Sequence, residues 1–409
     1  MSRAEIVDPR KRLRAEITLA KESIYPGEEA PFLARLIGLI GMRNSIALSV
    51  ALDISPSMDG GKLFYAKHSL IQALDVLGPG DFLYILGFCG RTYPIYGPKI
   101  IETSEDLMEA KRRIAEVKLC PKTNLGEALA KLMRVLHDLP GEDFVPCALL
   151  LTDGQPTVGE RDPLKLIDIL IKARGELDAP VIAIGVGRDY NEGLLLEIAE
   201  KTNGKFEHIS DLLDLEKVVL NEVLKAAQVA AKNVQFLIEH PEGIEVDVYG
   251  RRIKKEGEAL RVDLGYLSSG DVEDIVGAIK VPPVYPRSNA QIRFRLRYID
   301  ASEGIVVESQ SAMLTLNVGK APSTVNQAVI QKVELVRTIE KLKAAIKERD
   351  YARAIAYLRS VAEKTVSLGD LNLKERTMDI IELLEKGEFE EAAKRAASLA
   401  SKASRGKGV

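Results

Sequence analysis

The stretch SIALSVALDISPSMDGGK, residues 45–62, decides the fold class of this chain. Its first part, 45–55, is apolar on both faces, as expected of a strand in a sheet that helices cover on both sides. Pro56 and the pair Gly60-Gly61 then end the strand in a loop. From Lys62 onward apolar residues recur at three- and four-residue spacing, which predicts a helix. The stretch therefore predicts the first strand–loop–helix unit of an α/β domain.

The same alternation continues along the chain to about Gln228. Apolar runs predict strands, and amphipathic patterns predict helices between them. The predicted strands cover residues 45–55, 81–89, 147–154 and 180–187. The predicted helices cover residues 62–77, 104–117, 124–139 and 162–177, and the runs 191–204 and 211–228 predict two more. Alternation of this kind predicts a doubly wound, mostly parallel, Rossmann-like sheet.

The segments on either side of this domain carry strand patterns of another kind. Residues 11–40 predict two strands around a Pro-Gly turn, and residues 233–318 alternate polar and apolar side chains between turn signals. Such a pattern is typical of an antiparallel β-sandwich. The first strands are too few to bury a face alone, so we expect them to pair with the later set. The α/β domain is then an insertion within the sandwich.

The last part of the chain has a helical pattern and predicts a small all-α bundle. Pro322 and Ser323 mark its start, with Ser323 as the expected N-cap of the first helix. We therefore expect four parts along the chain. They are N-terminal sandwich strands (1–43), the α/β domain (44–229), the rest of the β-sandwich (230–319) and the C-terminal helical bundle (320–409).

Composition restricts the environment and the kinds of partner. The formal net charge of the 409-residue chain is only −3, so no overall field favours nucleic acid. The N-terminus lacks the apolar core of a signal peptide, and no uninterrupted apolar run reaches about 18 residues. The three cysteines, Cys89, Cys120 and Cys147, fit reduced thiols better than a disulfide framework. We therefore expect a cytoplasmic protein that binds neither nucleic acid nor a membrane.

Side chains that carry oxygen atoms gather at the predicted carboxyl ends of strands. Asp53, Ser55 and Ser57 follow the first strand at alternate positions, Asp153 ends a later strand, and Thr123 stands just before a helix. Ligands of an open α/β sheet bind beyond the carboxyl ends of its strands. Carboxylate and hydroxyl oxygens suit Mg²⁺ rather than zinc or copper. The sequence therefore predicts a site for Mg²⁺ (or Mn²⁺).

This arrangement resembles the metal-ion-dependent adhesion site of von Willebrand factor A domains, found in integrins, complement proteases and many microbial proteins. The family pattern is Asp-x-Ser-x-Ser, then a Thr and then an Asp further along, and this chain carries all five in order. The resemblance implies that Ser55 and Ser57 coordinate the ion directly. It also implies that Asp53 and Asp153 act directly or through water, and that Thr123 joins them in the ligand-binding state.

The resemblance covers about residues 45–228 and implies a function. With few directly bound carboxylates the ion stays electrophilic, so its last position can accept a carboxylate from an Asp or Glu of a partner protein. We therefore expect a non-enzymatic, metal-dependent protein-interaction module, with no catalytic residues, in a cytoplasmic regulatory or assembly complex. Pro56, where many relatives have Gly, is expected to stiffen the loop without removing a ligand.

The layout also resembles that of intracellular microbial A-domain proteins, among them archaeal ones that partner phosphopeptide-binding forkhead-associated proteins. That resemblance implies phosphorylation of the C-terminal tail, where Ser398, Ser401 and Ser404 lie among Lys and Arg residues. Added phosphate would then govern partner binding. The sequence leaves the identity of the partner and the oligomeric state open.

Three other functions fit parts of the pattern. A Mg²⁺-dependent hydrolase or phosphatase would use Asp53 as its nucleophile, but Ser55 stands where a second Asp would act as acid/base. An accessory subunit of a hexameric AAA-type ATPase is a second alternative, since the chain itself has no P-loop. An RNA-binding scaffold like that of the Ro ribonucleoprotein is disfavoured by the negative charge and the absence of tryptophan.

Two tyrosines stand close to the predicted site. Tyr93 and Tyr96, in the segment RTYPIYGP, are predicted to lie in a loop. Packing in the core or in a turn is favoured for both, and a place at the border of the metal face is the alternative.

Overall fold

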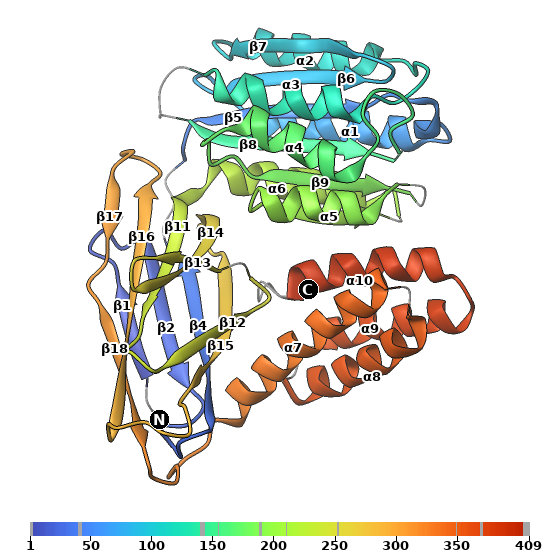
Figure 1. The fold of residues 1–409 in the computed structure, drawn as a ribbon. Helices are drawn as coiled ribbons and strands as arrows, with labels where there is room; N and C mark the ends of the chain where they lie inside the picture. The colour runs from blue at the N-terminus through green and yellow to red at the C-terminus, as the bar shows by residue number, and fades with distance from the viewer. Residues whose placement is uncertain are drawn as a thin grey trace. The chain divides into compact units, whose positions relative to one another are not determined.

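The computed structural model describes residues 3–39, 43–139, 144–153, 155–187, 190–209, 211–251, 253–348, 350–368 and 371–403 (Figure 1). The chain divides into two compact units. One comprises residues 42–232 and 301–304, and the other comprises residues 1–41, 233–300 and 305–409. Within the described ranges, no helix is long and apolar enough to span a bilayer.

The unit of residues 42–232 holds a six-stranded sheet with the order β10-β9-β8-β5-β6-β7. Its strands are β5 (Ile46–Asp53), β6 (Phe82–Phe88), β7 (Thr92–Ile100), β8 (Val145–Thr152), β9 (Val181–Val186) and β10 (Lys205–Ile209). All neighbouring pairs are parallel except β6 and β7. Strands β5, β6 and β9 are buried at every residue, so both faces of the sheet need cover.

Helices on both faces provide this cover. They are α1 (Lys62–Ala73), α2 (Ser104–Glu116), α3 (Leu125–His137), α4 (Pro163–Arg174), α5 (Glu192–Lys201) and α6 (Asp214–Ala227). Helices α3 and α4 contact each other on one face, and α1 and α6 contact each other on the opposite face (Figure 1). The predicted doubly wound α/β fold is therefore confirmed.

Strand β7 contradicts the prediction of a loop around Tyr93 and Tyr96. It runs antiparallel to β6 at the edge of the sheet, with Tyr96 opposite Ile85. Tyr96 is only 4% exposed and packs in the core, whereas Tyr93 is partly exposed. Pro94 and Pro98 hid the strand in the sequence, but an edge strand accepts proline because its outer N–H groups need no partner.

The other unit holds two mainly antiparallel sheets, with the orders β1-β2-β4-β15-β12 and β13-β14-β11-β16-β18-β3. Strand β4 pairs with both β2 and β15, so the N-terminal strands join the later set as predicted. The rings of Phe32 (β4) and Phe294 (β16) lie 6.1 Å apart between centroids, so side chains of both sheets meet in one core. The strands are β1 (Arg3–Val7), β2 (Leu13–Leu19), β3 (Ser23–Ile24), β4 (Glu29–Gly38), β11 (Val229–Glu239), β12 (Glu245–Tyr249), β13 (Ile253–Glu256), β14 (Ala259–Ser268), β15 (Val272–Lys280), β16 (Asn289–Asp300), β17 (Val306–Glu308) and β18 (Ala312–Val318).

Four helices complete this unit, as the all-α pattern of the C-terminal part predicted. They are α7 (Gln327–Lys347), α8 (Tyr351–Leu368), α9 (Leu371–Glu385) and α10 (Phe389–Ala403). Buried apolar residues from all four, among them Leu342, Leu358, Ile380 and Leu399, form one cluster. The predicted N-cap is wrong, because Asn326 caps α7 while Ser323 donates hydrogen bonds to the carboxylate of Glu22.

Gly277 in β15 gives a direct test of the sandwich. A Cβ atom at this position would lie 2.1 Å from the backbone oxygen of Asp247 and 2.5 Å from the ring of Phe32. Gly277→Ala is therefore expected to lower the free energy of unfolding by about 1–3 kcal/mol, because β12 cannot retreat without losing its pairing to β15. Urea unfolding measures the change. Gly193→Ala in α5, where a Cβ meets nothing closer than 3.5 Å, is the control and should leave stability unchanged or higher.

Candidate metal centre

Two buried carboxylates meet at the carboxyl edge of the α/β sheet. Asp53 is the last residue of β5, and Asp153 directly follows β8. The two strands are parallel neighbours with Leu52 opposite Leu151, so their carboxyl ends lie at the same edge. Both aspartates are fully buried. The register of the sheet therefore brings together two predicted ligands that are far apart in sequence.

The loop after β5 connects these two aspartates through the predicted serines. The backbone N–H of Ser55 donates to Oδ1 of Asp53 at 2.9 Å. The hydroxyl of Ser57 donates to Oδ1 of Asp153 at 2.7 Å. The Oγ atoms of Ser55 and Ser57 lie 2.9 Å apart, and Ser55 is the donor in this second bond because the Ser57 proton is already used. A short 3₁₀ turn at Pro56–Met58 bends the loop back toward Asp153, and the buried Met58 side chain anchors this turn. Four of the five predicted metal ligands, Asp53, Ser55, Ser57 and Asp153, are thus linked in one continuous chain of hydrogen bonds.

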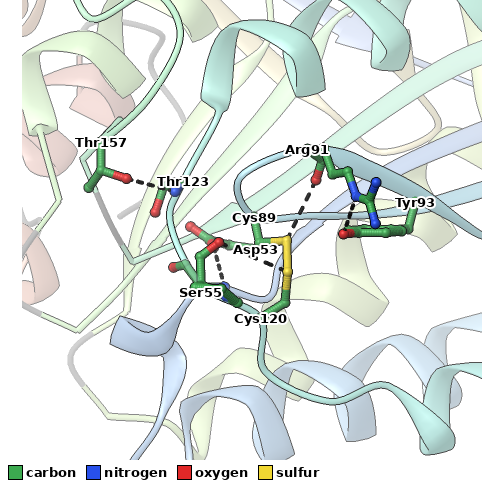
Figure 2. Close-up of a disulfide and its surroundings, with 9 residues drawn as sticks. Asp53, Ser55, Cys89, Arg91, Tyr93, Cys120, Thr123 and Thr157 are labelled. Carbon is green, nitrogen blue, oxygen red and sulfur yellow. Dashed lines mark hydrogen bonds between the residues drawn. A yellow bond between two sulfur atoms is a disulfide. The ribbon is translucent and has the colours of Figure 1, made fainter.

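Thr123 lies in the loop before α3, and backbone bonds hold this loop on two sides. Its N–H donates to Thr157 Oγ1 at 2.8 Å, and its carbonyl accepts from the N–H of Thr157 at 2.9 Å (Figure 2). On the other side, the N–H of Cys120 donates to the carbonyl of Ile54 at 2.8 Å. Since Ile54 stands between Asp53 and Ser55, the Thr123 loop is fixed directly to the segment that carries the other donors.

A disulfide joins Cys89 and Cys120 beside the site, with their Cα atoms 5.8 Å apart (Figure 2). The prediction of reduced thiols is therefore wrong for these two residues. Cys89 follows β6 and Cys120 lies in the Thr123 loop, so their proximity depends on the sheet order and not on their spacing of 31 residues. Cys147 is a free, buried thiol, as predicted, and burial raises its pKa to about 12.

Burial and the nearness of the two carboxylates make the charged form of Asp53 costly when no cation is bound. Burial raises the pKa of Asp53 to about 6, and the nearby charge of Asp153 acts in the same direction, although hydrogen bonds from Thr152 and Ser55 oppose the rise. Thr152 Oγ1 donates to Oδ2 of Asp53 at 2.6 Å. Lys62 Nζ lies 2.6 Å from Oδ2 of Asp153. Sequence reasoning missed both Thr152 and Lys62, although Thr152 directly precedes a predicted ligand.

The donor set fits a hard divalent cation. It offers two carboxylates and three hydroxyls, all oxygen ligands of the kind that Mg²⁺ and Mn²⁺ prefer. In the described part of the chain, no group of three or more His, Cys, Asp or Glu side chains is placed to hold a metal. The hydroxyls of Ser55, Ser57 and Thr123 are therefore needed to complete a site here. The N-terminus of α3, capped by Asn124, stands beside Thr123 and favours an anionic ligand.

Comparison with known proteins finds similarity to one family in this part of the chain. Residues 48–221 match the family model of the von Willebrand factor type A domain. Inter-alpha-trypsin inhibitor heavy chain H1 of Sus scrofa is 27% identical over 240 residues, which cover 54% of this chain and 26% of that protein. The chain thus spans about a quarter of the length of the curated relatives it matches.

Two solved structures share the fold over most of the chain. A von Willebrand factor type A protein from Catenulispora acidiphila has a TM-score of 0.74 at 18% identity, covering 92% of this chain and 90% of that one. The ArnB paralog VWA2 from Sulfolobus acidocaldarius has a TM-score of 0.67 at 20% identity, covering 97% and 99%. The resemblance extends beyond the α/β sheet, so the added sheets and C-terminal helices also recur in known structures.

Proposed function

We propose that this chain, whose residues 48–221 match the von Willebrand factor type A family model, holds such a domain and binds a partner protein through a divalent cation. Domains of this family are commonly metal-dependent protein-interaction modules. The observation that carries the proposal is the chain of contacts from Asp53 through Ser55 and Ser57 to Asp153. It supports a preformed oxygen site at the edge of the sheet.

Each residue of the proposed site has a role. Asp53 and Asp153 supply the negative charge that attracts Mg²⁺ or Mn²⁺, and the hydroxyls of Ser55, Ser57 and Thr123 supply neutral oxygens. When bound, the cation supplies an electrophilic position that accepts a carboxylate from an Asp or Glu of the partner. Because Ser57 is exposed while both aspartates are buried, the site faces outward at the serine loop. A partner carboxylate is therefore expected to approach from that side.

The surroundings of Asp53 favour binding over catalysis. A nucleophilic carboxylate needs an oxygen that is free to reach the substrate. Asp53 is fully buried, and its two oxygens accept hydrogen bonds from Thr152 and from the N–H of Ser55. These contacts support the proposal of a non-enzymatic module over a hydrolase or phosphatase. Copurification with a hexameric AAA-type ATPase would favour the accessory-subunit alternative instead.

Several finer features stay predictions. The four-part boundaries and the forkhead-associated partner under phosphorylation control rest on sequence pattern or resemblance alone. Ser404 and the side chains of Ser398 and Ser401 lie outside the described residues. The cytoplasmic location also stays a prediction, and the cysteine count supports it less once Cys89 and Cys120 form a disulfide, since such bonds persist mainly in oxidising compartments.

Affinity capture tests the proposed function. The immobilised protein is expected to retain its partner from a lysate of the source organism with Mn²⁺ present and to release it in EDTA. The variant Ser55→Ala/Ser57→Ala is expected to lose capture, because it removes two hydroxyl donors from the site. Ser269→Ala/Ser360→Ala removes two hydroxyls from the other unit and should leave capture unchanged. Retention that is equal in EDTA and in both variants would rule out the metal face as the interface.

A further inference from the structure

Lys62, the first residue of α1, places a positive charge inside the proposed metal site. Its Nζ lies 2.6 Å from Oδ2 of Asp153 and 3.1 Å from the backbone oxygen of Ser57. The Lys62 side chain is only 19% exposed, and the Asp153 side chain is fully buried. This ion pair is therefore largely shielded from solvent, unlike an ordinary surface pair.

The fold makes room for this lysine at Gly187, which follows β9. A Cβ atom on Gly187 would lie 2.9 Å from Cε and 3.1 Å from Nζ of Lys62. Gly187 also has a φ of +83°, a backbone conformation that favours glycine. Its N–H donates to the carbonyl of Ile209 at 2.9 Å, which fixes this turn to the end of β10. The lysine stem thus lies in a cradle built by the carboxyl edge of the same sheet.

The ion pair divides the oxygens of Asp153 between two partners. Oδ2 contacts the ammonium group of Lys62, and Oδ1 accepts the hydroxyl of Ser57. The two buried aspartates carry two negative charges, and Lys62 offsets one of them. A divalent cation held by the same aspartates would therefore stand close to a fixed positive charge, which repels it.

From these contacts we infer that Lys62 is a tethered counter-ion that sets the metal affinity of the site. Its ammonium group stabilises the buried charge of Asp153 when no metal is bound, and it weakens metal binding by repulsion when metal is bound. The site can then exist folded without metal and exchange its cation. The inference rests on the metal site of the proposed function, but it does not depend on any partner protein.

Lys62→Met tests the inference, because methionine keeps a flexible stem and removes the charge. Calorimetric titration with Mn²⁺ is expected to give a Kd at least about tenfold lower than that of the wild type, since a unit charge about 5 Å from a divalent ion costs this much even in water. In EDTA the thermal midpoint of the variant is expected to fall, because Asp153 loses its buried counter-ion. Saturating Mn²⁺ should restore that midpoint.

Two further variants complete the experiment. Lys172→Met removes the same charge from an exposed position in the last turn of α4 and should keep the wild-type Kd. If Lys62→Met does not fold without metal, Lys62→Gln removes the charge while keeping a donor for Asp153, and the same lower Kd is expected. An unchanged or higher Kd in the Lys62 variants would overturn the role of Lys62. Absence of Mn²⁺ uptake by the wild type would instead overturn the metal site itself.

Discussion

Replacing Asp53 with Asn is expected to lower the affinity of the protein for Mn²⁺ by at least about 100-fold. The substitution keeps the shape of the side chain and an oxygen for the N–H of Ser55, but it removes one of the two negative charges of the site. Changes to groups that merely orient metal ligands already cost about 10–100-fold in affinity, so loss of a charged ligand should cost more. Calorimetric or paramagnetic titration with Mn²⁺ measures the effect.

Stability in EDTA shows whether the Asp53→Asn protein is folded. A neutral amide is less costly to bury than a carboxylate, so the thermal midpoint without metal should equal or exceed that of the wild type. Asp59→Asn is the matched control, because Asp59 lies in the same loop but is exposed, and its carboxylate accepts the N–H of the neighbouring Gly60. Equal losses in both variants would point to a general charge effect, and undiminished uptake by Asp53→Asn would contradict the proposed site.

The fold class was predictable because burial on two faces leaves a strong pattern. Strands β5 and β9 are continuous apolar runs, and each is followed by a helix with one apolar stripe. The edge strand β7 was not predictable in this way. Its pairing with β6 depends on a partner strand, while Pro94, Gly97 and Pro98 interrupt its own pattern. Local pattern thus identifies a buried central strand and fails at an edge strand that tolerates proline.

The meeting of Asp53 and Asp153 was predictable for a different reason. Parallel strands place their carboxyl ends at one edge, so Asp53 and Asp153 could be expected to meet once both strands had been recognised. Their neighbours could not be predicted, because these depend on which side chains meet across strands and loops. Lys62 reaches Asp153 past Gly187, which has no side chain to crowd the lysine stem.

The Cys89–Cys120 disulfide shows the same limit of sequence reasoning and leads to the second large expected effect. Cys89→Ser/Cys120→Ser is expected to lower the free energy of unfolding by about 3–4 kcal/mol, since the bond closes a loop of sequence separation 31 and so restricts the unfolded chain. The same loop carries Thr123, so its remaining anchors near the site are backbone bonds such as that from Cys120 to Ile54.

Urea unfolding of oxidised and reduced protein separates the effect of the bond from that of the substitutions. Reduction of the wild type by a dithiol should lower its stability to that of Cys89→Ser/Cys120→Ser, and the same reductant should leave the variant unchanged. Cys147→Ala keeps the disulfide and should retain the full response to reductant, whatever its own stability. Wild-type protein that unfolds at the same urea concentration before and after complete reduction would show that the bond does not stabilise the folded protein. Because the bond lies between the end of β6 and this loop, its loss is also expected to raise the Kd for Mn²⁺, through disorder of the loop and without the loss of any ligand.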